Sequence, residues 1–241
     1  MILKQPNFWK KKNFISFLLY PLSTITLSIN FLKKFSFKNH FKIKTICVGN
    51  LNVGGTGKTS LVIELNKLLN KRLKTVFIKK NYSNQKDEFN LLKKRGKIIS
   101  ANDRINALKI AEKKFDVAIL DDGLQQKNIK YDLKIVCINS SEGLGNNFLL
   151  PAGPLRENID ELKNYDIVFF NGFKENKKLK KKIKELNKDL KIFDAIYEPI
   201  NIKKYNLKKN FLFFCGIGNP HEFENTLKKL KFKVKKKIIF P

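Results

Sequence analysis

The stretch Asn52-Val53-Gly54-Gly55-Thr56-Gly57-Lys58-Thr59 decides the fold of this chain. It links a β-branched run at 43–48, a predicted strand, to a helix predicted from the apolar spacing at 61–69. Glycines let the backbone wrap closely around a phosphate, and the N–H groups at a helix N-terminus add a positive field. We expect Lys58 to reach the β- and γ-phosphates of a nucleotide and the Thr59 hydroxyl to bind Mg²⁺. Although Asn52 replaces the usual first glycine, the stretch predicts a nucleoside triphosphate site.

Strand and helix signals alternate downstream of this loop. Asn102 is predicted to cap a helix through Ile110, and a lysine-rich helix is expected on the surface at about 175–190. Alternation of this kind predicts an α/β fold, P-loop NTPase-like, with a mostly parallel sheet flanked by helices. Short apolar runs typical of buried parallel strands lie at 75–78, 117–120, 135–138, 167–170 and 211–215.

Two acidic residues follow the predicted strand at 117–120. Such a strand delivers Asp121 and Asp122 to the carboxyl edge of the sheet, beside the phosphate loop. A carboxylate in that position binds Mg²⁺ directly or through water. A strand-end Asp is also common as a helix cap, but the phosphate loop upstream favours the metal interpretation.

The N-terminal region contains 20 uncharged residues, 13–32, between two lysine clusters. One helix of this length would span about 30 Å, but Pro21 interrupts it and several Ser, Thr and Asn residues dilute it. We expect a membrane-surface anchor made of two short helices broken at Pro21. A buried helical hairpin and a single membrane span remain alternatives. The predicted domains are an N-terminal membrane-associated segment at 1–40, a kinase core at 41–200 and the start of a C-terminal α/β subdomain at 201–241.

The chain is strongly basic, with 50 Lys and Arg against 21 Asp and Glu and a net charge of +29. Only four of the basic residues are arginines, and the lysines are spread along the whole chain. Nucleic-acid surfaces normally use arginine for bidentate and stacking contacts, so we expect no nucleic acid partner. The charge favours phosphate groups and acidic lipid headgroups. The three cysteines lie in apolar runs, which predicts buried thiols and a reducing cytosol.

Phosphoryl transfer also needs a group to orient the acceptor hydroxyl and cations to balance the developing charge. The candidates lie in predicted loops: Asp87-Glu88, Arg104 at a helix start, and Arg156-Glu157. Each of these is also compatible with ordinary surface charge or helix capping. However, two of the four arginines fall in these loops, and a site that needs a planar, permanently charged group would retain arginine.

Four segments together resemble the tetraacyldisaccharide 4′-kinase family, the lipid A kinases. They are the phosphate loop, Leu120-Asp121-Asp122-Gly123-Leu124-Gln125-Gln126, Leu149 to Glu157 with its Pro-Ala-Gly-Pro-Leu-Arg-Glu sequence, and Gly216-Ile217-Gly218-Asn219-Pro220. The resemblance runs from Asn7-Phe8-Trp9 to the last residue. It implies transfer of the ATP γ-phosphate to the 4′-hydroxyl of a lipid A disaccharide 1-phosphate precursor. It also implies a location on the cytoplasmic face of the inner membrane, and we expect a monomer.

The resemblance assigns a role to each candidate residue. ATP binding falls to Asn52 through Thr59, and the metal region to Thr59, Asp121 and Asp122. Asp87 becomes the candidate base, with Lys58 as the second catalytic residue, while Glu88, Arg104, Arg156 and Glu157 support the site. The sequence departs from the family at Lys79-Lys80-Asn81-Tyr82-Ser83, at Gln126 in place of a His, and at Phe240-Pro241, where the family continues into a histidine segment. From that last departure we expect nucleotide binding to be retained and turnover to be weaker.

Two other classes of protein remain as alternatives. A membrane-associated ATPase switch of the partition or cell-division type shares Gly-Gly-x-Gly-Lys-Thr, but it typically has a lysine where this chain has Val53. A lysine-rich NTPase that binds nucleic acid would show DNA retention with steep salt dependence. The shortage of arginine argues against this second class.

Overall fold

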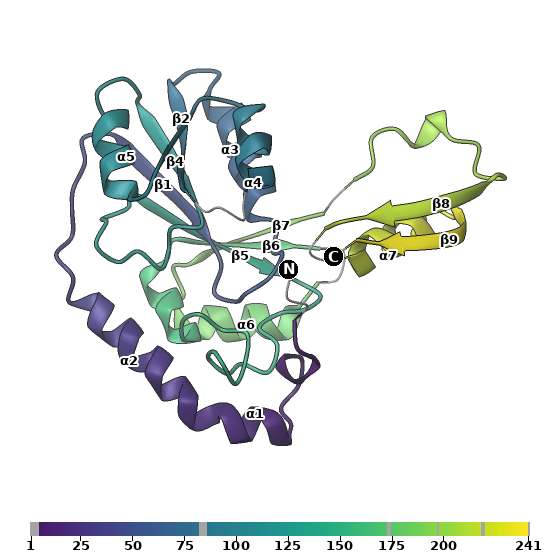
Figure 1. Ribbon diagram of the computed structural model, residues 1–241, viewed down its shortest axis with the longest axis horizontal. Helices are drawn as coiled ribbons and strands as arrows, with labels where there is room; N and C mark the ends of the chain where they lie inside the picture. Colours follow the sequence, from purple (N-terminus) through teal and green to yellow (C-terminus); the bar gives the residue numbers. More distant parts are fainter. Residues whose placement is uncertain (1–4, 82–85, 173–174, 197, 218–219, 241) are drawn as a thin grey trace.

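Seven parallel strands form the central sheet in this computed structural model of the chain (Figure 1). Their order across the sheet is β3-β2-β4-β1-β5-β6-β7. The structure describes residues 5–81, 86–172, 175–196, 198–217 and 220–240. The strands of this sheet are β1 (Lys44–Gly49), β2 (Thr75–Lys80), β3 (Ile98–Ala101), β4 (Val117–Asp121), β5 (Leu133–Asn139), β6 (Ile167–Asn171) and β7 (Lys191–Ala195).

Helices connect these strands and cover both faces of the sheet. Residues of α3 and α4 pack with one apolar core that includes Val48, Phe77 and Ile119, while α5 and α6 contribute to the core on the opposite face. Every strand pair in the sheet is parallel, because each connection crosses over rather than forming a hairpin. The helices are α3 (Lys58–Leu69), α4 (Lys86–Lys93), α5 (Arg104–Ala111) and α6 (Lys177–Leu186), with a 3-10 helix η3 (Ile159–Asn164) before β6.

The N-terminal segment forms two helices that run along one side of the molecule (Figure 1). A 3-10 helix η1 (Asn7–Trp9) leads into α1 (Phe14–Leu19), and the 3-10 turn η2 (Tyr20–Leu22) joins α1 to α2 (Ser23–Lys34). The predicted interruption at Pro21 is therefore confirmed. As one unit, Phe14–Lys34 has the length and composition to cross a membrane, and only 11% of its most apolar window is buried. It is not the buried hairpin left open by the sequence.

A separate βαβ unit follows the central sheet. Strands β8 (Asn210–Cys215) and β9 (Lys233–Ile239) pair in parallel, and α7 (Pro220–Lys229) connects them. The short 3-10 helix η4 (Ile202–Lys204) lies in the preceding connection, and the unit stands apart from the central sheet (Figure 1). The proposed cap Asn219 lies outside the described residues.

The structure corrects several local expectations. The cap of α5 is Asp103, whose side chain accepts a hydrogen bond from the Ile105 N–H, and not Asn102. Asp103 is the residue with extended backbone angles immediately before the helix, which is the geometry that an N-cap requires. The sequence reading missed β3, β7 and β9, which are short or carry few buried apolar residues. All three cysteines are buried and free, as predicted.

Candidate active site

The phosphate loop lies between the end of β1 and the first turn of α3. Gly54 has φ +128° and Gly57 has φ +81°, which are backbone conformations that L side chains rarely adopt. Gly57 is the N-cap residue of α3, so the helix begins at Lys58 and its first N–H groups face the loop. Thr59 lies in this first turn. The predicted strand–loop–helix arrangement is therefore present, and it forms an anion-binding helix N-terminus.

Asp121 is held beside this loop by the strand order. Because β4 pairs with β1, with Asp121 opposite Val48, its carboxylate lies at the same sheet edge as the loop. Asp121 is 1% exposed, and its Oδ2 accepts a hydrogen bond from Lys79 Nζ at 2.8 Å and from Thr59 Oγ1 at 3.4 Å. Its other oxygen, Oδ1, is buried without a hydrogen-bond partner among the described residues. Asp121 thus has one carboxylate oxygen available beside the Thr59 hydroxyl.

Lys79, at the end of β2, was not predicted as a site residue. Its ammonium lies 2.8 Å from Asp121 and 2.6 Å from Glu88 of α4, and its side chain is 4% exposed. Burial opposes the charged form, but the two carboxylates outweigh it and raise the pKa of Lys79 above its ordinary value. The signal available in the sequence was a lysine that ends a fully apolar strand in place of a surface residue.

Asp122 adopts a positive φ of 59°, which turns its side chain toward two cations. Lys58 Nζ lies 3.7 Å from Asp122 Oδ1, and Arg156 Nη1 lies 2.9 and 3.0 Å from the two carboxylate oxygens. Burial alone would raise the pKa of Asp122, but the charges of Lys58 and Arg156 outweigh it and hold that pKa below its usual value. Asp122 therefore positions both cations at the phosphate loop.

The segment from Leu149 to Glu157 packs directly on the phosphate loop. The Val53 N–H donates to the Pro154 carbonyl at 2.8 Å, and the Arg156 N–H donates to the Leu51 carbonyl at 2.6 Å. A Cβ at Gly153 would lie 2.2 Å from Asn146 Oδ1, so this position needs glycine. The distinctive sequence of this segment thus brings Arg156 to the site.

Arg104, at the start of α5, supports the carboxylate pair from behind. Its Nη2 donates to the backbone carbonyl of Asp122 at 2.8 Å, and its Nη1 donates to Gln126 Oε1 at 3.2 Å. The Gln126 amide nitrogen in turn donates to Asp103 Oδ1. Arg104 is 5% exposed, which places its guanidinium inside the fold rather than at the surface. It fixes the turn that carries Asp122.

Glu157 forms the centre of a second buried polar group. It is 1% exposed, and it accepts hydrogen bonds from Tyr165 Oη at 2.5 Å and from Gln125 Nε2 at 3.4 Å. Lys127 Nζ lies 2.6 Å from its Oε1. Burial, followed by the charge of Glu157, raises the pKa of Tyr165 far above its ordinary value. Because the Gln125 carbonyl oxygen accepts from Arg156 at 3.3 Å, this group also braces Arg156.

The structure brings most, but not all, of the predicted residues together. Lys58, Thr59, Asp121 and Asp122 meet at one edge of the sheet, and the loop residues Asn52 and Thr56 are buried there. Asp87 lies in the first turn of α4, exposed, and its side chain makes no ion pair or hydrogen bond with another described residue. Its neighbour Glu88 reaches the site through Lys79. Lys79, Gln125 and Lys127 are the members that the sequence reading missed.

A cavity of about 890 Å³ opens beside the phosphate loop. Gly57 and Ser60 line one side, while Phe169, Asn171 and Ala195 line the other from the ends of β6 and β7. In open parallel sheets, ligands bind outside the carboxyl ends of the strands, which is where this cavity begins.

The described residues contain no group of three or more His, Cys, Asp and Glu side chains that could hold a metal ion. A metal at this site would therefore need oxygen ligands from elsewhere, such as a nucleotide. The Thr59 hydroxyl and the unpartnered Asp121 Oδ1 are hard oxygen donors, the type that Mg²⁺ prefers. The residues present fit a magnesium ion that is shared with phosphate oxygens.

Comparison with known proteins gives concordant matches. Residues 15–241 match the family described as LpxK, tetraacyldisaccharide-1-P 4′-kinase. A tetraacyldisaccharide 4′-kinase of Pelagibacter ubique is 47% identical over 246 residues, covering 100% of this chain and 78% of the relative. The protein of the same name from Rickettsia canadensis is 36% identical, covering 99% of this chain and 78% of the relative. The crystal structure of LpxK from Aquifex aeolicus in complex with ATP superposes with a TM-score of 0.70 at 26% identity, covering 94% of this chain and 82% of that one.

Proposed function

Since the chain belongs to the tetraacyldisaccharide 4′-kinase family, we propose that the residues around its phosphate loop carry the kinase reaction. The chain is a phosphotransferase of lipid A biosynthesis, and it has the parallel α/β fold of its structurally characterised relative. Family membership favours this activity over the ATPase switch and the nucleic-acid NTPase. The proposed reaction moves the γ-phosphate of ATP to the 4′-hydroxyl of a lipid A disaccharide 1-phosphate precursor.

The proposal depends above all on Lys58 and Thr59 lying beside Asp121 and Asp122. Lys58 binds the β- and γ-phosphates, while the backbone N–H groups from Gly54 to Thr59 surround the phosphate tail. The nucleoside part of ATP enters the cavity beside Gly57. Asp122 holds Lys58 and Arg156 in position, so that both cations face the charge that develops on the transferred group.

Thr59 and Asp121 are the residues that would hold a magnesium ion, with Asp122 behind them. When bound, Mg²⁺ neutralises charge on the β- and γ-phosphate oxygens. Lys79 keeps the Asp121 carboxylate ionised and fixes its Oδ2, which leaves Oδ1 directed to the ligand side. This division of the carboxylate gives each oxygen a separate partner.

Asp87 is the proposed base, which accepts the proton of the 4′-hydroxyl. Its exposure in the first turn of α4 is compatible with contact to a large lipid substrate, and Glu88 ties that helix to the metal region through Lys79. Arg104 and Glu157 act by positioning, because their side chains bind the backbone of Asp122 and the Gln125–Arg156 pair.

The test separates nucleotide binding from transfer. Purified protein is incubated with γ-labelled ATP, Mg²⁺ and disaccharide 1-phosphate lipid in neutral detergent, and ATP affinity is measured separately. We expect Lys58→Ala to lose both ATP affinity and label transfer, and Asp87→Asn to retain affinity while losing transfer. Asp189→Asn, an exposed carboxylate after α6, is the matched control and stays active. Full transfer by Asp87→Asn would remove the base from the proposal.

We also propose that α1 and α2 lie in the surface of a membrane, the cytoplasmic face of the inner membrane for a lipid A enzyme. The helices turn their polar residues inward: Ser23, Thr26 and Asn30 donate to the carbonyls of Leu149, Leu150 and Arg156 at 2.9, 2.8 and 2.7 Å. Their large apolar side chains point away from the protein. The exposed ones include Phe14, Phe17, Leu18, Ile25, Phe31 and Leu32, each between 57% and 81% exposed. Such an exposed apolar face is typical of a membrane-contacting helix.

Vesicle flotation tests this orientation. We expect Ile25→Glu, at a position 58% exposed on α2, to weaken binding to lipid vesicles strongly. The matched variant Leu68→Glu changes a side chain that is 62% exposed on α3, and it should bind vesicles as the unaltered protein does. Equal loss in both variants would contradict the orientation.

A further inference from the structure

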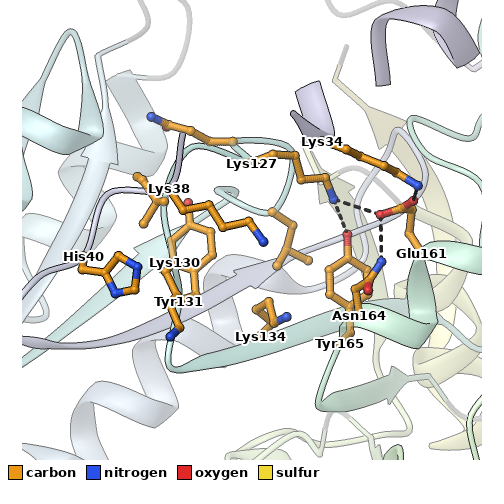
Figure 2. Close-up of a pocket in the computed structure, with 13 residues that line it drawn as sticks. Lys34, Lys38, His40, Lys127, Lys130, Tyr131, Lys134, Glu161, Asn164 and Tyr165 are labelled. Carbon is orange, nitrogen blue, oxygen red and sulfur yellow. Dashed lines mark hydrogen bonds and ion pairs between the residues drawn. The ribbon is translucent and has the colours of Figure 1, made fainter. Parts of the chain in front are cut away.

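A second cavity, of about 550 Å³, lies away from the phosphate loop, between the end of α2, the 124–134 segment and η3 (Figure 2). Its walls carry five lysines and only one carboxylate, Glu161. Tyr131 and Tyr165 form part of the lining, together with His40. None of the roles assigned above uses this cavity. The lysines are Lys34, Lys38, Lys127, Lys130 and Lys134.

Two of these lysines are already neutralised. Lys34 Nζ lies 2.6 Å from Glu161 Oε1, and Lys127 Nζ lies 2.6 Å from Glu157 and 3.3 Å from Glu161. Figure 2 shows Lys127 directed at Glu161 and Tyr165 on one side of the cavity. Two carboxylates and two ammonium groups therefore balance on this side. This balanced group forms a fixed wall.

The other three lysines have no such partner. Among the described residues, no carboxylate pairs with Lys38, Lys130 or Lys134. Lys134 is half-buried at the start of β5, so its ammonium has given up part of its hydration without gaining a counter-charge. Bringing three like charges to one concavity costs electrostatic energy. An anion in the cavity would remove that cost.

The position of the cavity indicates the source of the anion. It opens at the carboxyl end of α2, where the exposed apolar face continues through Leu32 and Phe35 to Phe37. Phe35 and Phe37 are 74% and 83% exposed, and they flank the chain immediately before Lys38. A side chain that follows such aromatics lies at the level where acyl chains meet headgroups when the helix contacts a bilayer.

We propose that this cavity binds the phosphate of an anionic lipid headgroup at the membrane surface. The inference rests on the membrane orientation proposed above and adds a specific headgroup site to it. Lys38, Lys130 and Lys134 supply the charge, and lysine suits a phosphate oxygen as a compact donor. The Lys34–Glu161–Lys127 group supplies the rigid wall beside it. The same chemistry would accept a free phosphate, and the experiment below distinguishes the two.

The experiment compares two pairs of charge-removing substitutions. The test variant is Lys130→Ala with Lys134→Ala; the control is Lys181→Ala with Lys182→Ala, two exposed lysines of α6 without an ion pair among the described residues. Binding is measured to vesicles of phosphatidylcholine alone and of phosphatidylcholine with phosphatidylglycerol. A lysine near an anionic surface contributes about fivefold in affinity, so the test variant should bind anionic vesicles roughly tenfold or more weakly. The control variant should change little, and neutral vesicles should not distinguish the two.

Each other outcome overturns the inference. Equal loss in both variants would indicate general attraction of a basic surface. A raised KM for the lipid substrate in neutral detergent would make the cavity part of the substrate site. Protection of Lys134 from amine labelling by inorganic phosphate alone, equal to that by anionic vesicles, would assign a free anion. Kinase activity in neutral detergent should be unchanged in the test variant, so failure here leaves the proposed function standing. Loss of binding by Ile25→Glu alone, with both lysine pairs intact in behaviour, would support the orientation without the site.

Discussion

The buried ion pair between Lys79 and Asp121 gives the most demanding prediction. In Lys79→Met the side chain keeps its length but loses the ammonium that lies 2.8 Å from Asp121. Asp121 is 1% exposed, and the Thr59 hydroxyl at 3.4 Å is its remaining described donor. Removing one partner of a buried pair leaves an uncompensated charge and costs about 3–5 kcal/mol. We therefore expect the free energy of unfolding to fall by about that amount.

Urea unfolding of a small set of variants measures this cost. Adding Asp121→Asn to Lys79→Met removes the stranded charge, so the double variant should recover about 2 kcal/mol relative to Lys79→Met. The control is Lys44→Met, which breaks the Lys44–Asp132 pair whose side chains are 74% and 44% exposed. Exposed pairs contribute about 0–1 kcal/mol. A loss in Lys79→Met as small as in Lys44→Met, or a double variant no more stable than Lys79→Met, would refute the reasoning.

Three further predictions follow from the site. Thr26→Val removes the hydroxyl that donates to the Leu150 carbonyl but adds apolar surface, so vesicle binding should be retained while kinase kcat falls severalfold in a label-transfer assay; unchanged kcat would mean that α2 does not position the segment. Gly153→Ala places a methyl group against Asn146 and should lower the melting temperature by several degrees in a thermal scan, whereas an unchanged temperature would show that the segment adapts. The lowered pKa of Asp122 stabilises the fold above the unfolded pKa of about 3.9, and this contribution is lost as the pH falls through the folded value. Urea titrations should therefore show Asp122→Asn with a shallower acid decline than the unaltered protein, and parallel curves would contradict this.

The fold was largely predictable from the sequence because its decisive elements are buried parallel strands. Runs such as 117–120 are continuously apolar, and the strands that they predict appear within one or two residues. β7 and β9 escaped because their residues are mostly exposed or intermediate, so no apolar run marks them. Edge strands of this kind are specified by pairing with a neighbour rather than by their own pattern.

The site was predictable where its residues are close in the sequence. Lys58 with Thr59, and Asp121 with Asp122, each belong to a local pattern with a known backbone context. Lys79 and Lys127 are single residues among many lysines, and only the folded arrangement distinguishes them. The two-sided character of α2 was also hidden, because Ser23, Thr26 and Asn30 read as dilution of an apolar segment until their carbonyl partners were seen.

Those three inward hydrogen bonds join α2 to the same segment that carries Arg156. If the outer side of the helix rests among lipid tails, the depth of that helix sets how far the transfer centre stands above them. The enzyme then selects a lipid by the height of its sugar ring over the bilayer, and acyl length matters only as far as it alters that height.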